Sequence, residues 1–351
     1  MSFTIGVCGF SGTGSSAVVD LLKEYEINQV IDKCEFILPY EPDGIVDLDF
    51  HLNKGTCKYS SSNTAIFRFL KAIRGGQFRY IRELSSGKLV KYGEDYIDNL
   101  VQCNWVGSDP ANACNSPLRD LARRAVGKFH FGKPYYYLEK MFGRNLNLFP
   151  MGQMRFSSYP DGFYQYTREF LLNVIDSLEP INPAKNLVLD QPFPGNNPEL
   201  CFPYFFNPKA IVVDRDPRDI YLLTKEFWFK SQAWRPLPTD TVDHFVSYYR
   251  GLRLADSLTK KNENVLKIQF EDLVYRYDET RIKIEKFLDL PSNMNQMTHF
   301  NPALSINNTQ VFNYYSGYKS EIQQIERALP EYLFPFEKYG EVRFDRESMF
   351  E

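Results

Sequence analysis

Blocks of apolar residues separated by polar turns predict strands that alternate with helices along much of the chain. Residues 3–8 form a short apolar run that ends in glycines, and residues 15–24 carry apolar side chains at helical spacing. A β-branched run at 210–214 is followed by Asp216 and Pro217, which suit the cap and the first turn of a helix. We therefore expect two strand–loop–helix units in these regions.

Further strands and helices follow from the same patterns. The strands are expected at 186–189 and 265–270, and the helices at 217–229, 244–261 and 278–288. Strands that alternate with helices need crossover connections, which produce a mostly parallel sheet covered on both faces. The pattern therefore predicts an α/β fold.

The stretch from about residue 54 to residue 185 lacks this alternation. It is rich in Tyr, Phe, Asn, Gly and Pro, and helical spacing is clear only near 64–73 and 116–126. Neither an internal repeat nor a low-complexity linker separates it from the flanking sequence. We therefore expect one domain over residues 1–351, with 54–185 as a helical elaboration of it.

The composition is that of an ordinary soluble protein. The 351 residues carry a formal net charge of −3, so bulk electrostatics will not hold a nucleic-acid duplex. The six cysteines include no CxxC pair, and no histidines cluster beside them, so no metal site or disulfide framework is predicted. The N-terminus lacks the features of a signal peptide, and no run of about eighteen apolar residues is present to span a membrane. A cytoplasmic protein is expected.

Residues 9–16, Gly-Phe-Ser-Gly-Thr-Gly-Ser-Ser, lie between the first predicted strand and the first predicted helix. Backbone N–H groups and the helix dipole converge on an anion at such a junction. The nucleotide-binding pattern G-x-x-x-x-G-K-[ST] is matched at Gly9, Gly14 and Ser16. Ser15, however, stands where that pattern requires the lysine that holds a triphosphate, so the loop favours a different anion.

The same segment resembles the 5'-phosphosulfate loop of sulfotransferases that use 3'-phosphoadenosine 5'-phosphosulfate (PAPS), with the pattern G-x-x-[RK]-[ST]-G-[ST]-[ST]. The matching residues are Gly9, Thr13, Gly14, Ser15 and Ser16. Gly12 stands where that family has a basic residue that helps to neutralise the leaving phosphate. The resemblance therefore implies that the loop backbone and hydroxyls surround a phosphate as in that family, but without the positive charge of the family's basic residue.

Two later segments resemble further motifs of this family. Residues 211–220 are similar to its 3'-phosphate motif, which implies that Arg215 pairs with the 3'-phosphate, as suits a guanidinium fork. Thr224 lies one position after the place of the family's serine and is the candidate substitute for it. Residues 265–273 are similar to the family's later strand and E-D-L turn.

The charged residues after Arg215 also have a structural interpretation. Asp216 is expected to cap the following helix. Arg218 and Asp219 either contact the ligand or form an ion pair on the first helical turn. Near the C-terminus, Asn307-Asn308-Thr309 and a helix from Ser320 resemble the family's closing segment, so that the resemblance covers about 1–52 and 186–340.

The resemblance implies an enzyme with a doubly wound, mostly parallel sheet of the P-loop type. Such an enzyme transfers a sulfuryl group from PAPS, its co-substrate, to a hydroxyl-bearing small molecule or glycan, here in the manner of bacterial carbohydrate and polysaccharide sulfotransferases. A metal is not required. Donor binding falls on Gly9, Ser11, Gly12, Thr13, Gly14, Ser15, Ser16, Arg215 and Thr224.

Transfer to an alcohol needs a base for the attacking hydroxyl. Glu35 occupies the place where several members of the family carry a catalytic glutamate, and it is the first candidate, although a surface carboxylate at a strand end explains it as well. Asp190 ends a strand on the same expected edge and is the candidate to orient the acceptor or to act as the base instead. His51 is the best placed of the four histidines because it follows the Glu35 segment.

Two other functions remain open. A P-loop kinase or NTPase would use Asp190 as the strand-end aspartate that helps to hold Mg²⁺, although the missing loop lysine disfavours it. A catalytically inactive relative that binds a nucleotide or a partner is the other alternative, because Gly12, Leu223 and Asp190 each replace a residue that the resembling family uses.

Overall fold

The computed structural model describes residues 3–107, 152–228, 237–258, 262–292 and 297–342. The chain forms two compact units, the first from residues 1–39 and 179–351 and the second from residues 40–178. The second unit is therefore an insertion in the sequence of the first, and the elaboration expected at 54–185 overlaps it. The single-domain organisation stays a prediction.

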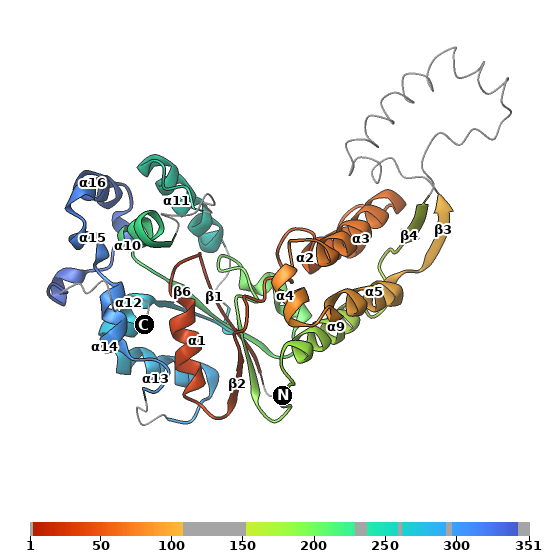
Figure 1. Cartoon of the computed structure of the whole chain (residues 1–351), viewed down its shortest axis with the longest axis horizontal. Coiled ribbons are helices and arrows are strands. Elements are labelled where there is room, and N and C mark those ends of the chain that lie inside the picture. Colours follow the sequence, from red (N-terminus) through yellow and green to blue (C-terminus); the bar gives the residue numbers. More distant parts are fainter. Residues whose placement is uncertain (1–2, 108–151, 229–236, 259–261, 293–296, 343–351) are drawn as a thin grey trace, which may run out of the picture. The chain divides into compact units, whose positions relative to one another are not determined.

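A parallel sheet of five strands forms the centre of the first unit (Figure 1). The strands are β1 (Thr4–Gly9), β2 (Asn28–Ile31), β5 (Asn186–Asp190), β6 (Pro208–Asp214) and β7 (Val265–Gln269). Their order is β2-β5-β1-β6-β7, and all neighbouring pairs are parallel. The chain starts in the middle at β1 and extends the sheet in both directions, so the sheet is doubly wound and the predicted α/β class is confirmed.

Helices α1 (Ser15–Lys23) and α13 (Tyr277–Leu288) pack their apolar sides against the strands. The shared core contains Val18, Val19, Leu21, Leu22, Ile284 and Leu288 from the helices and Ile5, Val7, Val188, Ile211 and Val213 from the strands. The short helix α12 (Phe270–Tyr275) joins β7 to α13. Phe270, which the pattern placed at the end of the strand, therefore begins a helix that contains the E-D-L residues.

A second core of the first unit surrounds α10 (Pro217–Leu223), α11 (Val242–Leu258) and α16 (Lys319–Ala328). Its largest members include the fully buried rings of Tyr221 and Phe245. The helix expected through about residue 229 changes its hydrogen-bond pattern at the π-helix η3 (Thr224–Trp228).

Short helices complete the first unit. They are η2 (Pro198–Tyr204), α14 (Pro302–Ser305), η4 (Ile306–Asn308), α15 (Val311–Tyr314), η5 (Ser316–Tyr318), η6 (Pro330–Tyr332) and η7 (Phe336–Lys338). The segment that begins at α14 returns to the start of α10, since Asp216 accepts a hydrogen bond from the N–H of Phe334 at 2.8 Å.

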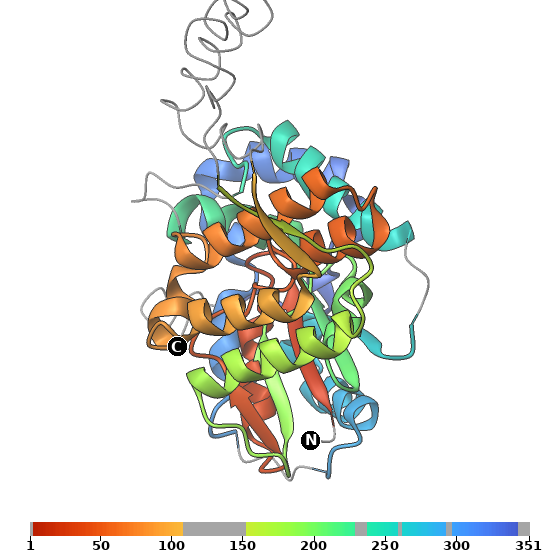
Figure 2. The same ribbon diagram turned by 90° about the vertical axis from the view of Figure 1, so that its right-hand side faces the viewer.

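The second unit is mainly helical. It contains α2 (Ile45–Asp49), η1 (Phe50–Lys54), α3 (Tyr59–Arg74), α4 (Arg79–Leu84), α5 (Lys88–Leu100), α9 (Phe163–Leu178) and an antiparallel pair, β3 (Cys103–Gly107) with β4 (Gly152–Phe156). Figures 1 and 2 show α5 beside α9, and the rings of Tyr96 and Phe170 stack between these helices with centroids 4.9 Å apart. The helix expected near 64–73 lies in α3, whereas the one expected near 116–126 lies outside the described residues.

Across the described parts of both units, no helix combines the length and the apolar character needed to cross a membrane.

Candidate functional site

The strand order identifies one position at the edge of the sheet for ligand binding. The strands β1 and β6 are neighbours, but the chain leaves β1 towards β2 and leaves β6 towards β7. In open α/β sheets, ligands bind beyond the carboxyl ends of strands that diverge in this way. The segments at these two ends are the loop 10–14 after β1 and Arg215 after β6.

The loop 10–14 is tightly curled. Ser11, Gly12 and Gly14 have φ angles of 67°, 69° and 89°, in the left-handed region that favours glycine. The N–H of Phe10 donates to Thr13 Oγ1 at 3.2 Å, so the buried Thr13 hydroxyl closes the loop from inside. Ser11 and Ser16, by contrast, are exposed and present their hydroxyls to solvent.

Gly9, the last residue of β1, and Gly14, the last residue of the loop, have no room for a side chain. A Cβ at Gly9 would lie 2.1 Å from Thr13 Oγ1 and 2.8 Å from the carbonyl oxygen of Val213. A Cβ at Gly14 would lie 2.5 Å from Cδ2 of Phe270. Glycine is therefore required at both positions, because the backbone packs directly against β6 at Gly9 and against α12 at Gly14.

Arg215 lies beside this loop and is only 3% exposed. Its Nη1 donates to the carbonyl oxygen of Gly12 at 3.4 Å, and its Nη2 donates to the carbonyl oxygen of Asn308. The guanidinium lies over the ring of Phe270, 4.6 Å from its centroid. Arg215 therefore links the loop to α12 and to the C-terminal segment, whereas its Nε has no hydrogen-bond partner among the described residues.

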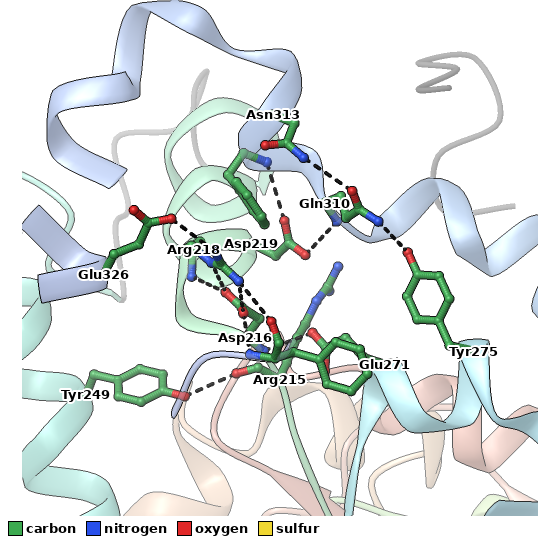
Figure 3. Close-up of polar contacts among 12 residues, drawn as sticks. Arg215, Asp216, Arg218, Asp219, Tyr249, Glu271, Tyr275, Gln310, Asn313 and Glu326 are labelled. Carbon is green, nitrogen blue, oxygen red and sulfur yellow. Dashed lines mark hydrogen bonds and ion pairs between the residues drawn. The ribbon is translucent and has the colours of Figure 1, made fainter. Parts of the chain in front are cut away.

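Three carboxyl groups surround Arg215. Burial lowers the pKa of Arg215, while Asp219, Glu271 and Asp216 oppose that shift by their charges. Burial also raises the pKa of Asp219 to about 7 and that of Glu271 well above its usual range. Glu271 Oε1 accepts from the N–H of Asp216 at 2.9 Å, and Oε2 has no partner among the described residues (Figure 3). An arginine keeps its charge in this setting, so the group carries positive charge into a buried acidic surrounding.

The residues that follow Arg215 stabilise the fold (Figure 3). Asp216 caps α10 by accepting from the N–H of Arg218 at 2.9 Å, as predicted. Arg218 pairs with Asp216 at 2.8 Å and with Glu326 at 3.0 Å, so the first of these carboxylates, and not Asp219, is its partner on the first helical turn. Asp219 instead accepts from the N–H of Gln310 at 2.9 Å, because its carboxyl faces the start of α15.

Thr224, the candidate substitute for the family's serine, is 1% exposed at the first residue of η3. Its Oγ1 has no hydrogen-bond partner among the described residues. A buried hydroxyl without a partner costs free energy, and such groups in native structures often contact a ligand or a water.

The end of β5 brings acidic groups to the start of α1. Ser15 Oγ accepts from Gln191 Nε2 at 2.9 Å and hydrogen-bonds to the Asp190 carboxyl, so both capacities of this hydroxyl are engaged by β5 and the residue after it. The N–H of Phe36 donates to the carbonyl oxygen of Asp190 at 2.8 Å, which places the neighbouring Glu35 near the same strand end. Two of the three candidate catalytic residues, Glu35 and Asp190, are therefore brought together.

Asp190 has an unusual environment for an aspartate. Burial raises its pKa to about 7, and the charges of Glu35, Asp32 and Asp20 add to the shift, while the hydrogen bond from Ser15 opposes it. One of its oxygens, Oδ1, is enclosed and has no hydrogen-bond partner among the described residues. Glu35 has an exposed side chain, yet the protein around its carboxyl displaces enough water to raise its pKa as well. Asp190 is thus able to take up a proton near neutral pH, and the pKa of Glu35 is shifted in the same direction.

His51 belongs to the second unit, on η1, where its ring packs edge-on against Phe50 with centroids 5.2 Å apart. It is therefore not gathered with Glu35 and Asp190 inside one unit, and its catalytic role stays a prediction. Within the described ranges no group of three or more His, Cys, Asp or Glu side chains is arranged to hold a metal ion.

The sequence did not identify several residues that complete the site. Phe270 and Asn308 contact Arg215, and Gln191 contacts Ser15. Phe270 precedes the E-D-L motif, but no local pattern indicates that its ring packs against a loop more than 250 residues earlier. Only the pairing of β1, β6 and β7 brings these segments together.

Comparison with known proteins gives distant structural likenesses only. No family model matches the sequence, and no curated protein matches it. The sulfotransferase domain from the curacin biosynthetic pathway is 14% identical, with a TM-score of 0.40, and the match covers 95% of this chain and 99% of that domain. The sulfotransferase STF9 from Mycobacterium avium is 11% identical, with a TM-score of 0.36, and the match covers 97% of this chain and 78% of that protein. Likenesses of this strength assign no activity to this chain.

Proposed function

We propose that this protein transfers a sulfuryl group from PAPS to a hydroxyl group of a carbohydrate acceptor. The observation that carries the proposal is the contact between Arg215 and the carbonyl oxygen of Gly12. It joins a curled, glycine-rich loop at a helix N-terminus to a buried guanidinium, at the position where strands β1 and β6 diverge. A donor with two phosphate-bearing ends requires two such anion sites side by side.

The residues present fit a bisphosphate nucleotide. The loop from Gly9 to Ser16 would hold the 5'-phosphosulfate through its backbone N–H groups and exposed hydroxyls. Arg215 and Thr224 would hold the 3'-phosphate, and both have a buried polar atom without a partner among the described residues. When bound, PAPS would supply both the sulfuryl group and a phosphate leaving group.

The chain supplies the base for the acceptor hydroxyl. We assign this role to Glu35, with Asp190 as its partner, because the two carboxyls lie at the same strand end and burial raises the pKa of each, that of Asp190 to about 7. A catalytic base works best when its pKa lies near the working pH. The net charge of −3 supports an acceptor that is not a nucleic-acid duplex.

One observation favours a kinase or NTPase as the second candidate, namely the hydrogen bond between Ser15 and the strand-end carboxyl of Asp190. Against it, Ser15 replaces the lysine that a triphosphate needs, and Gly12 adds no positive charge. A protein that binds the nucleotide without turnover is the third candidate, and Gly12 is the residue that favours it.

Binding of adenosine 3',5'-bisphosphate, measured by calorimetry with and without Mg²⁺, tests the proposal. We expect binding that does not need Mg²⁺ and that Arg215→Ala weakens by about 1.5–3 kcal/mol, the range for a hydrogen bond to a charged group. Arg215→Lys keeps the positive charge but loses the paired N–H donors of the guanidinium. This variant should bind adenosine 3',5'-bisphosphate more weakly than the unaltered chain. Arg276→Ala removes an exposed arginine from the end of α12 and should leave the affinity unchanged. Tighter, Mg²⁺-dependent binding of ATP would replace this proposal with the second candidate.

A further inference from the structure

Helix α11 contacts both anion-binding segments of the first unit, although no sequence motif marks it. Arg253 on this helix is 5% exposed and lies over the ring of Phe10 in the loop, 4.4 Å from its centroid. Its Nε donates to Asp214 Oδ2 at 3.0 Å, and its Nη2 donates to Asp214 Oδ1. One guanidinium therefore connects the loop after β1 to the last residue of β6.

Tyr249, one helical turn earlier, holds the other segment. Its hydroxyl donates to the carbonyl oxygen of Arg215 at 3.1 Å (Figure 3). Burial raises the pKa of this phenol well above its usual range, so it remains a donor at any ordinary pH. The ring of Tyr249 also lies against the guanidinium of Arg253, 3.3 Å from the ring centroid.

Asp214 closes the arrangement. Its Oδ1 accepts from the N–H of Arg215 at 2.8 Å in addition to the contact with Arg253. Phe10, Asp214, Tyr249 and Arg253, which we call the α11 brace, are thus joined on one side to the loop and on the other to the backbone of Arg215. The ion pair with Asp214 neutralises the charge of Arg253. Arg253 therefore acts on the site by holding the loop and β6 in place, and not by offering a free positive charge to a ligand.

We infer that Tyr249 and Arg253 are positioning residues that set the separation between the phosphate loop and Arg215. This inference rests on the proposed function, in which one donor spans both anion sites. A ligand with two phosphates gains affinity over its single-phosphate fragments only if both sites are held at the matching distance. The α11 brace should therefore increase the affinity for the bisphosphate and leave the affinity for each monophosphate fragment unchanged.

The test compares three ligands by calorimetry: adenosine 3',5'-bisphosphate, adenosine 5'-monophosphate and adenosine 3'-monophosphate. Removal of Arg253 alone would leave the Asp214 charge without its partner, so the variant is the double substitution Asp214→Asn with Arg253→Gln. We expect it to weaken the bisphosphate by roughly tenfold or more, while both monophosphates change by less than about twofold. A role in general stability would instead weaken all three ligands in proportion.

Tyr249→Phe is the second variant, because it keeps the buried ring and removes only the hydroxyl that holds Arg215. It should show the same selective loss, at roughly two- to fivefold. Arg250→Gln is the matched control, since Arg250 lies on the same helix with a side chain that is 53% exposed.

A proportional loss for all three ligands, or no loss in either brace variant, overturns the inference and leaves the proposed function standing. An unaltered chain that fails to bind the bisphosphate overturns the proposed function, and the inference with it.

Discussion

The carboxyl of Asp190 is crowded by protein and by other acids. Glu35, Asp32 and Asp20 all act on it, and its pKa of about 7 means that it is partly protonated at neutral pH. Two of these neighbours, Asp32 and Asp20, are paired with Lys23, at 2.6 and 2.7 Å. Glu35 is the neighbour with no ion pair among the described residues, which makes it the group to substitute first.

At the scale of this residue we predict that Glu35→Gln leaves binding of adenosine 3',5'-bisphosphate intact and abolishes sulfuryl transfer. An amide keeps the size of the carboxyl but cannot accept a proton, so only the base function is lost. Transfer from radiolabelled PAPS to a panel of glycans measures the effect. Glu26→Gln, at an exposed position after α1, is the control, and turnover equal to that of the unaltered chain would remove Glu35 from the mechanism.

The position at which helix α1 begins depends on the residue before it, Gly14, more than on the residues of the helix itself. Gly14 is the N-cap of α1 and has no side chain to cap the helix, so the helix start is set by backbone conformation and by the packing of Phe270. Gly87 is the N-cap of α5 in a similar left-handed conformation, with φ of 79°, but apart from its adjoining backbone no heavy atom of the described residues lies within 4 Å of the position of its Cβ. A side chain at Gly87 would meet only the free-energy cost of the left-handed backbone, whereas a side chain at Gly14 would also overlap the ring of Phe270.

We predict that Gly87→Ala costs about 1–2 kcal/mol of folding free energy, the penalty for a side chain in the left-handed region. Gly14→Ala should cost this amount and a further 1–3 kcal/mol or so, because its Cβ overlaps the ring of Phe270. Urea unfolding followed by circular dichroism compares the two variants. Equal losses would show that Phe270 yields to the extra atom, contrary to the close packing described above.

For the molecule as a whole, the buried carboxyls link stability to pH. Burial raises the pKa values of Asp190 and Asp219 from 3.8 to about 7. Between these two values the folded state holds protons that the unfolded state has released, so the free energy of unfolding falls as the pH rises. Glu271, whose pKa is raised well above its usual value, acts in the same direction.

We therefore predict that the protein is more stable at pH 5 than at pH 7.5, with a slope of order 1 kcal/mol per pH unit for each such group. Asp190→Asn should make the dependence shallower, since the amide does not titrate. Asp243→Asn, at an exposed position in the first turn of α11, should not change it. Urea unfolding at several pH values gives the slopes, and a stability that rises from pH 5 to pH 7.5 would contradict the assignment.

The local sequence determined the elements that surround the site. The alternating apolar blocks predicted the strands β1, β5, β6 and β7, and Asp216-Pro217 predicted the start of α10. Such features are readable because a strand or a helix must place its apolar residues on one face, and because a cap acts within a few residues. The glycine-rich loop and Arg215 were found for the same reason, as short motifs next to predicted strand ends.

The tertiary structure alone decided which side chains meet. Arg218 pairs with Asp216 and Glu326 rather than with Asp219. Arg253 reaches a loop more than 240 residues earlier in the chain. These contacts depend on strand order and on the crossing of helices over the sheet, which no local pattern contains, because a charged residue accepts any partner that the fold brings within reach.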